Sequence, residues 1–272
     1  KMSLRASASW NLTLLPCCAL AVWWAFRRVR PRAPDAALLR RLDAIVLDCD
    51  GVLYRDSAPV EGVAIALRRL RESGKRLFFV TNAASASRAS LAAKLTDLGF
   101  EGVAPDQCVT SAYAAAHYLA REHPEVKRAY VVGGGGLLDE LRNAGIEPVG
   151  QDDVGGLEAL IASGGLNDDV HAVVVGMQTE GLCYARLAKA AAYARDHSRP
   201  FVGTNPDQNW PAGLTELLPA GGCNVRYVAY ASEREPDAIV GKPSADLAKL
   251  VAQITGLKSD TTLMVGDRWA IL

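Results

Sequence analysis

The sequence predicts an α/β fold: a Rossmann-like parallel sheet with a second α/β segment inserted into it. From residue 43 onward, short apolar runs rich in β-branched residues alternate with stretches of helical periodicity. Strands separated by helices imply a parallel sheet that is covered on both faces. Polar residues directly follow several of the apolar runs, at the sheet edge where open α/β folds hold their ligands.

The composition excludes several classes of protein. Half of the 272 residues are hydrophobic, which is enough to build a large core. Lys plus Arg number 30, as do Asp plus Glu, so the chain lacks the basic excess of a nucleic-acid-binding surface. High apolar content with zero net charge also argues against intrinsic disorder. The six cysteines have no metal-ligand spacing, so we expect no zinc site.

We expect residues 1–42 to be a leader outside the fold. Residues 1–34 hold six basic residues and no acid, and the apolar stretch 12–26 precedes the sequence RRVRPR. A secretory signal carries its charge before the apolar stretch, and this stretch is short for a membrane anchor. An organelle transit peptide fits the basic composition, and a disordered leader is the alternative. We therefore expect a cytoplasmic location, or a plastid or mitochondrion if the leader is a transit peptide.

The first part of the body alternates strand and helix. The apolar run DAIVLD (43–48) predicts a buried strand, and residues 61–74 an amphipathic helix closed by glycine. RLFFVT (76–81) predicts a second strand, and residues 87–99 a helix, because three leucines follow helical spacing. A short strand at 108–111 and an alanine-rich helix ending near His123 follow.

A second set of elements then begins. Strands are predicted at 129–134, 171–176, 199–205, 239–244 and 261–267. Helices are predicted at 137–145, 184–196, 224–233 and 245–255.

Asp48 and Asp50 form the strongest local motif, Asp-Cys-Asp-Gly at the end of the first strand. Two neighbouring carboxylates repel each other unless a cation or a shared proton offsets their charge. Mg²⁺, which prefers carboxylate and carbonyl oxygens, is the natural partner. Taken alone, the motif also fits a turn or a fragment of a calcium loop.

Three weaker motifs follow at later strand ends. Thr81 and Asn82 close the second strand, where a hydroxyl, an amide and backbone N–H groups can hold phosphate oxygens or simply cap a turn. Lys242, between Gly241 and Pro243, is a point charge suited to phosphate. Asp267 ends the last predicted strand. The four motifs together are far more specific than any one of them.

In their order and spacing, the four motifs resemble the haloacid dehalogenase superfamily of phosphatases, in the subgroup with a large α/β cap of the C2 type. The segments LDCDGVLY, FVTNAASASR, GTNPDQNWP, AYASEREPDAIVGKPS and MVGDR match the phosphoglycolate, pyridoxal phosphate and 4-nitrophenyl phosphatase group. The resemblance covers about residues 43–268. It implies a Mg²⁺-dependent phosphoric monoester hydrolase. It also implies a discontinuous core domain, residues 43–124 and 237–272, and an inserted domain, residues 125–236, that forms the cap.

The resemblance also implies a role for each site residue. Asp48 would be the nucleophile that forms an aspartyl-phosphate, and Asp50 the general acid and base. Thr81 and Lys242 would complete the catalytic set. The substrate would be bound by Gly51, Thr81, Asn82, Ala83, Trp210 and Lys242. Mg²⁺ would be held by Asp48, the Asp50 carbonyl and Asp267.

Some positions depart from the family pattern. Gln178 stands where an acid is common, and Ala83 and Ala86 replace an asparagine and a lysine. After Arg268 the chain reads Trp-Ala-Ile-Leu, where the family continues with a second acid, a helix and another strand. We therefore expect C-terminal core elements to be missing, with weakened metal support and an exposed sheet edge.

The substrate expected from the resemblance is a small phosphorylated metabolite, 2-phosphoglycolate first. Pyridoxal phosphate, or general activity on 4-nitrophenyl phosphate, is the alternative. A truncated, catalytically impaired form is a second alternative. We expect no nucleic-acid partner, and a homodimer through the cap. The glycine run 133–136 could suggest a dinucleotide loop, but no GxGxxG register with a downstream acid follows, so we expect a strand-to-helix turn.

Overall fold

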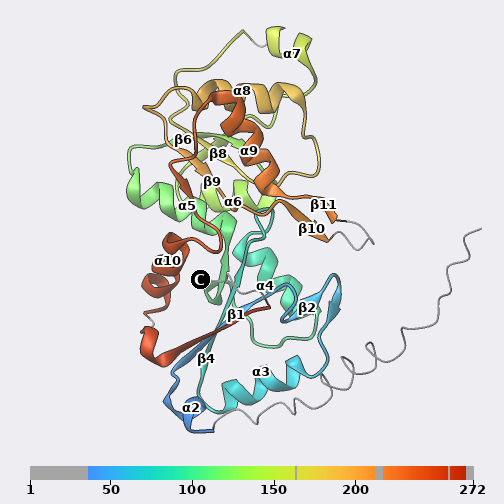
Figure 1. The fold of residues 1–272 in the computed structure, drawn as a ribbon, viewed down its shortest axis with the longest axis vertical. Coiled ribbons are helices and arrows are strands. Elements are labelled where there is room, and N and C mark those ends of the chain that lie inside the picture. The colour runs from blue at the N-terminus through green and yellow to red at the C-terminus, as the bar shows by residue number, and fades with distance from the viewer. Residues whose placement is uncertain (1–35, 163, 212–216, 257, 268–272) are drawn as a thin grey trace, which may run out of the picture. The chain divides into compact units, whose positions relative to one another are not determined.

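The computed structural model describes residues 36–162, 164–211, 217–256 and 258–267 (Figure 1). The chain divides into two units, Lys1–Arg41 and Leu42–Leu272. In the first unit the described residues form one short helix, α2 (Ala36–Arg41). This helix falls inside the predicted leader, residues 1–42, of which residues 1–35 lie outside the described part. Leu42, the last residue of that leader, is buried and belongs to the second unit. Within the described ranges, no helix has the length and apolar character needed to cross a membrane.

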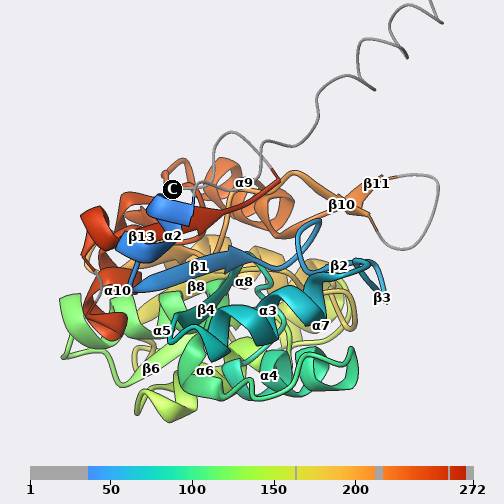
Figure 2. The ribbon, with the colours of Figure 1, turned by 90° about the horizontal axis from the view of Figure 1, so that it is seen from below.

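The first sheet of the second unit has the order β13-β1-β4-β5, and all its strand pairs are parallel. Its strands are β1 (Ala44–Asp48), β4 (Arg76–Thr81), β5 (Cys108–Thr110) and β13 (Thr262–Val265). In Figure 2, β13, β1 and β4 lie side by side in the order in which they pair. The four predicted strands and their parallel arrangement are confirmed.

The second sheet is also parallel throughout, in the order β12-β9-β8-β6-β7. Its strands are β6 (Arg128–Val132), β7 (Glu147–Val149), β8 (Ala172–Val175), β9 (Phe201–Gly203) and β12 (Ala238–Ile239). The strand predicted at 239–244 is therefore only two residues long and belongs to this sheet. The predicted domain border at residue 237 falls just before β12. It therefore puts β12 in the core domain, although β12 pairs with β9 of the second sheet.

Eight helices of at least six residues cover the sheets in the described part of the second unit. They are α3 (Val63–Glu72), α4 (Arg88–Asp97), α5 (Ser111–Glu122), α6 (Gly135–Asn143), α7 (Leu157–Ala162), α8 (Tyr184–Ala194), α9 (Gly221–Ser232) and α10 (Ala245–Thr255). Two short hairpins, β2 (Tyr54–Arg55) with β3 (Ala58–Pro59) and β10 (Asn209–Pro211) with β11 (Leu217–Pro219), complete the fold together with the 3₁₀ turns Pro105–Gln107 and Ser259–Thr261.

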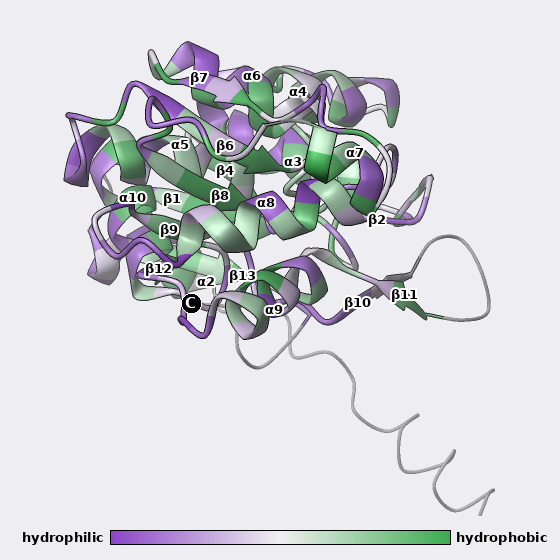
Figure 3. Ribbon diagram, turned by 90° about the horizontal axis from the view of Figure 1, so that it is seen from above, coloured by the Kyte–Doolittle hydropathy of each residue, from purple (hydrophilic) through white to green (hydrophobic). Residues whose placement is uncertain are grey.

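Strand β1 shows why both faces of the first sheet are buried. Successive side chains of a strand point to opposite faces. Ile45 and Leu47 pack in a cluster with Leu91 and Leu95 of α4, whereas Val46 packs in a second cluster. That second cluster contains residues of both sheets and of helices α5, α6 and α10, so one continuous apolar core lies between the two sheets. In Figure 3 the strands of both sheets are strongly hydrophobic, and the outer loops are mostly hydrophilic.

Side-chain caps explain where three helices begin. Ser87 accepts a hydrogen bond from the Ser90 N–H at the start of α4 (3.2 Å), and Thr110 caps α5 in the same way through the Tyr113 N–H (3.1 Å). Ser244 caps α10 by accepting from the Asp246 N–H (3.1 Å). Such caps satisfy N–H groups that the helix itself leaves unpaired.

The structure differs from the sequence prediction mainly in its short elements. The hairpins, β7 and α7 were not predicted, because runs of two to six residues carry too little periodicity. Helix α9 begins at Gly221, three residues before the predicted start. A Cβ atom at Gly222 would lie 2.5 Å from the carbonyl oxygens of Pro206 and Asp207, so glycine is required where the helix meets that loop.

Candidate active site

The site is built where β1 and β4 end next to each other. Asp48 is the last residue of β1 and pairs in register with Val80, one residue before the end of β4 at Thr81. The parallel arrangement therefore brings the loops that follow both strands to the same sheet edge. Asp48 and Thr81 are both buried, with 6% and 1% of their surface exposed.

Asp48 forms a buried ion pair with Lys242. The Lys242 Nζ donates to Oδ1 of Asp48, and the Cys49 N–H donates to the same oxygen at 2.7 Å. None of the hydrogen bonds among the described residues engages the other oxygen, Oδ2. Burial raises the pKa of Asp48, Lys242 offsets part of that rise, and the negative charge of Asp267 adds to it.

Asp50, Gly51 and Asp267 gather beside this pair. The Thr81 hydroxyl donates to Oδ2 of Asp50 at 3.3 Å, and the Asp50 side chain is exposed. Gly51 has φ 82°, and a Cβ atom there would overlap the Asp267 carboxylate, so only glycine allows this close approach. The Gly51 N–H donates to the Tyr54 carbonyl at 2.8 Å and is thus used within its own turn.

The side chain of Asn82 connects the β4–α4 loop (residues 82–87) to Lys242. Its Oδ1 accepts the Lys242 N–H at 2.7 Å, and its Nδ2 donates to the Lys242 carbonyl at 3.1 Å. The same Nδ2 donates to Oδ2 of Asp207 at 3.0 Å. The Asn82 carbonyl accepts from Asn205 Nδ2 at 2.7 Å and from the Ser111 hydroxyl at 2.9 Å. Asn82 is therefore braced from three other segments of the chain.

Two predicted substrate-binding residues have other surroundings. The Ala83 N–H donates to the Thr81 hydroxyl at 3.1 Å, so a ligand at this N–H would have to take its place. Trp210 lies on the β10–β11 hairpin, outside both large sheets, with 38% of its surface exposed. It is not part of the hydrogen-bonded cluster around Asp48.

Four residues of the cluster were not predicted from the sequence. They are Tyr54, Ser111, Asn205 and Asp207. Burial raises the pKa of the Tyr54 phenol, and a hydrogen bond to Asp50 raises it further. The polar run Thr-Asn-Pro-Asp after β9 was a usable signal for Asn205 and Asp207, since it too follows a strand end.

Cys49 lies between the two aspartates but faces the core. It is fully buried in the cluster that contains Leu91 and Leu95. Burial raises the pKa of its thiol well above the usual value, and the charges of Asp50 and Asp48 raise it further. The thiol is therefore held in its neutral form, which is a poor nucleophile.

Comparison with known proteins places this geometry in a family. A profile described as haloacid dehalogenase-like hydrolase matches residues 45–147. The chain is 40% identical to the glycerol-3-phosphate phosphatase of Gallus gallus over 236 residues, covering 85% of this chain and 75% of that protein. The chain belongs to the haloacid dehalogenase-like hydrolases. This confirms the resemblance found in the sequence, and with it a phosphoric monoester hydrolase.

Further relatives support the same assignment. Phosphoglycolate phosphatase 2 of Arabidopsis thaliana is 34% identical, covering 85% of this chain and 78% of that protein. The solved structure of glycerol phosphate phosphatase from Mycobacterium tuberculosis with magnesium aligns with a TM-score of 0.72 at 29% identity, covering 86% of this chain and 64% of that one. The α/β fold predicted from the sequence is thereby confirmed. The predicted lack of C-terminal core elements stays a prediction, because residues 268–272 lie outside the described part.

Replacing Asn82 tests the bracing of Lys242 in this hydrolase. Asn82→Ala removes the amide that holds both backbone groups of Lys242, so we expect kcat/KM for 4-nitrophenyl phosphate to fall about 10- to 100-fold, as for other residues that orient active-site ligands. Steady-state kinetics measure this. Asn143→Ala, at an exposed asparagine of α6, is the control and should keep wild-type activity. Equal activity of the two variants would contradict the bracing role.

Proposed function

We propose that the chain is a Mg²⁺-dependent phosphatase that hydrolyses a small phosphomonoester through an aspartyl-phosphate intermediate. The observation that carries the proposal is the buried Asp48 carboxylate. One of its oxygens is held by Lys242 and the Cys49 N–H, and the described residues make no hydrogen bond to the other. A carboxylate held in one orientation with one oxygen left for attack is a suitable nucleophile for phosphorus.

The proposed reaction has two steps. Oδ2 of Asp48 attacks phosphorus, the ester P–O bond breaks, and Asp50 gives its proton to the departing alcohol oxygen. Asp50 then takes a proton from water, the water oxygen bonds to phosphorus, and the bond between phosphorus and Asp48 breaks to release phosphate. The exposed position of Asp50 supports this role, because its carboxyl can reach both solvent and substrate.

Lys242 and the β4–α4 loop bind the phosphoryl group in this proposal. Lys242 offsets the charge of Asp48 and of the incoming phosphate, where Coulomb interactions are strengthened by burial. The Thr81 hydroxyl and the N–H groups of Asn82 and Ala83 would donate to phosphoryl oxygens. The Thr81 hydroxyl and the Ala83 N–H have partners within the protein, which phosphate would replace. Gly51 allows the left-handed turn after Asp50 and the close approach of the Asp267 carboxylate.

The residues at this edge fit a hard divalent cation. Asp48 and Asp267 lie close enough that the charge of Asp267 raises the pKa of Asp48, a repulsion that a cation would relieve. These two carboxylates and the Asp50 carbonyl are oxygen donors of the kind Mg²⁺ prefers. When bound, the cation would offset negative charge on Asp48 and on the phosphate. Among the described residues there is no group of three or more His, Cys, Asp or Glu side chains able to hold a metal, so the set depends on that carbonyl.

Two substrates are proposed. 2-Phosphoglycolate is the substrate expected from the sequence, and the name of the Arabidopsis relative supports it. Glycerol 3-phosphate is the second candidate, because the chicken glycerol-3-phosphate phosphatase is more similar, at 40% against 34% identity. The lysine of the described cluster is already paired with Asp48, and the glycolate carboxylate would need a cationic partner of its own.

We propose that residues 125–236 act as a cap that selects the substrate and excludes water. The contacts of Asn205 and Asp207 with Asn82 support this, since they bring the loop after β9 to the phosphate-binding segment. Trp210, on the β10–β11 hairpin that follows this loop, is the residue we propose to contact the leaving group. A homodimer through the cap remains a prediction.

Removing the nucleophile or the metal should abolish hydrolysis. We expect Asp48→Asn to lower kcat for 4-nitrophenyl phosphate at least about 1,000-fold, as loss of a catalytic nucleophile does elsewhere. We expect EDTA to abolish wild-type activity and added Mg²⁺ to restore it. Nitrophenol release, followed by absorbance, measures both. Metal-independent hydrolysis that survives Asp48→Asn would refute the proposal.

The role of Asp50 predicts a burst of nitrophenol release in the Asp50→Asn variant. 4-Nitrophenolate leaves without a proton, so Asp50→Asn should still form the aspartyl-phosphate from 4-nitrophenyl phosphate but hydrolyse it about 100- to 10,000-fold more slowly. Stopped-flow absorbance should show up to one nitrophenol released per enzyme, followed by slow turnover. On glycerol 3-phosphate, whose alcohol needs the proton, the first step should also slow. A uniform loss on both substrates without a burst would argue against this assignment.

The two proposed substrates can be ranked directly. Phosphate release from glycerol 3-phosphate and 2-phosphoglycolate, measured at equal Mg²⁺ concentration, gives their ratio of kcat/KM. We expect glycerol 3-phosphate to be preferred about 10-fold. A carboxylate of 2-phosphoglycolate left without a partner would cost about 1.4 kcal/mol, which corresponds to that factor. A preference for 2-phosphoglycolate would support the substrate expected from the sequence instead. Activity on neither, with 4-nitrophenyl phosphate still hydrolysed, would exclude both.

A further inference from the structure

Helix α6, which lies between β6 and β7 in the chain, contacts the β4–α4 loop closely at its first turn. The Gly136 N–H donates to the Ser85 carbonyl at 3.1 Å. A Cβ atom at Gly136 would lie 2.5 Å from that carbonyl oxygen and would overlap the Ser87 nitrogen, so no larger residue fits without moving the loop. A Cβ atom at Gly134 would lie 2.9 Å from Cβ of Ser85. Gly134 and Gly136 of the glycine run therefore allow close packing against this loop.

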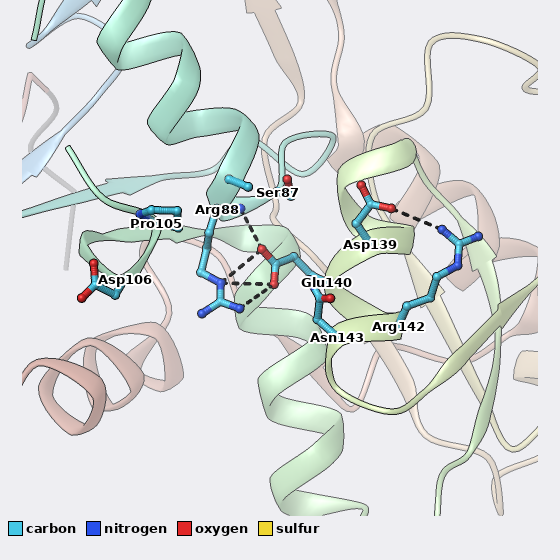
Figure 4. Close-up of a pocket in the computed structure, with 9 residues that line it drawn as sticks. Ser87, Arg88, Pro105, Asp106, Asp139, Glu140, Arg142 and Asn143 are labelled. Atoms are coloured by element: carbon cyan, nitrogen blue, oxygen red, sulfur yellow. Dashed lines mark hydrogen bonds and ion pairs between the residues drawn. The ribbon is translucent and has the colours of Figure 1, made fainter. Parts of the chain in front are cut away.

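One turn along α6, Glu140 holds the far end of the same loop. Its Oε1 accepts the backbone N–H of Arg88 at 2.7 Å, and its two oxygens accept from the Arg88 guanidinium at 3.1 to 3.2 Å. Figure 4 shows these bonds, with Asp139 and Arg142 paired to each other elsewhere on α6. The Glu140 side chain is 1% exposed, so the contact is geometrically fixed and shielded from salt.

Arg88 is itself held in place. Its guanidinium carbon lies 3.9 Å from the centre of the Tyr113 ring on α5. Arg88 is also the first residue of α4, where a carboxylate is favoured by the partial positive charge of the helix N-terminus. The β4–α4 loop is thus fixed at Asn82 by the contacts described above, at Ser85 by Gly136 and at Arg88 by Glu140.

We propose that Glu140 is a positioning residue for phosphate binding: from the second sheet, it sets the position of the β4–α4 loop and of the N–H groups at Asn82 and Ala83. This inference rests on the proposed function, in which those groups bind the phosphoryl oxygens. Asp48, Asp50 and Lys242 lie on other segments of the chain, and the Asn82 side chain has hydrogen bonds of its own to Lys242. Loss of Glu140 should therefore weaken binding of phosphate and of substrate while leaving the chemical step largely intact.

The test measures phosphate binding apart from turnover. In Glu140→Ala we expect the inhibition constant of inorganic phosphate and KM for 4-nitrophenyl phosphate to rise together, about 10-fold or more, because a misplaced binding group loses much of its effect. We expect kcat to stay near the wild-type value, the pattern of lost uniform binding. Glu140→Gln keeps an acceptor for the Arg88 N–H. Its inhibition constant for phosphate and its KM should lie between those of the wild type and Glu140→Ala.

Small carboxylates provide a second readout that a general packing defect would not give. Glu140 and Arg88 line a cavity of about 540 Å³, through which acetate can reach the space that the glutamate side chain leaves when it is removed. Acetate, compared with chloride at equal ionic strength, should return the phosphate inhibition constant of Glu140→Ala toward the wild-type value. It should have no such effect on Glu140→Gln, whose side chain fills the space.

Glu147→Ala is the matched control. It removes a glutamate of β7 that pairs with Arg128 and has 59% of its side chain exposed. This variant should change neither the phosphate inhibition constant nor KM. If Glu140→Ala does not fold, Glu140→Gln and Arg88→Lys carry the comparison.

The outcomes separate this inference from the proposed function. A folded Glu140→Gln or Glu140→Ala enzyme with wild-type phosphate inhibition, or one in which kcat alone falls, would overturn the positioning role while leaving the phosphatase intact. A wild-type protein that neither hydrolyses 4-nitrophenyl phosphate nor binds phosphate would overturn the proposed function, and this inference with it.

Discussion

The ion pair between Asp48 and Lys242 is the interaction on which the rest of the site depends. The two residues are 194 positions apart in the chain, and both side chains are about nine-tenths buried. Removing two charges from water costs several kcal/mol each, so such a pair is stable only with good geometry and further hydrogen bonds. The Cys49 N–H and the Val80 carbonyl supply such bonds, to the carboxylate and the ammonium respectively.

Much of the surrounding structure keeps this pair in place. Lys242 follows a strand of the second sheet, whereas Asp48 ends a strand of the first, so the pair spans the two sheets. The Asn82 amide fixes the backbone on the lysine side, and Asn205 and Asp207 fix Asn82. The continuous apolar core contains residues of both sheets and so joins the two halves away from the ion pair.

The sequence was sufficient to predict which residues at strand ends form the candidate site, but not the contacts that hold these residues in place. Asp48, Asp50, Thr81 and Lys242 stood out because each follows an apolar run, and parallel strands bring such ends together. Lys242 nevertheless reaches the site from a two-residue strand of the other sheet. The side chains of Asn82, Glu140 and Arg88 could not be paired from the sequence, because their partners lie 52 to 160 residues away and no local pattern specifies them.

The order of the strands along the chain also constrains how the protein is made. Ala44 of β1 pairs with Thr262 of β13, and the whole second sheet is synthesised between them. On the ribosome, β1 can pair with β4 early, but its other edge must wait until almost the entire body has emerged. Such long-range pairing slows folding and leaves an apolar strand edge exposed in the nascent chain. Efficient production should therefore depend on chaperones or on early formation of the second sheet, whose five strands all lie within residues 128–239 with no strand of the first sheet between them.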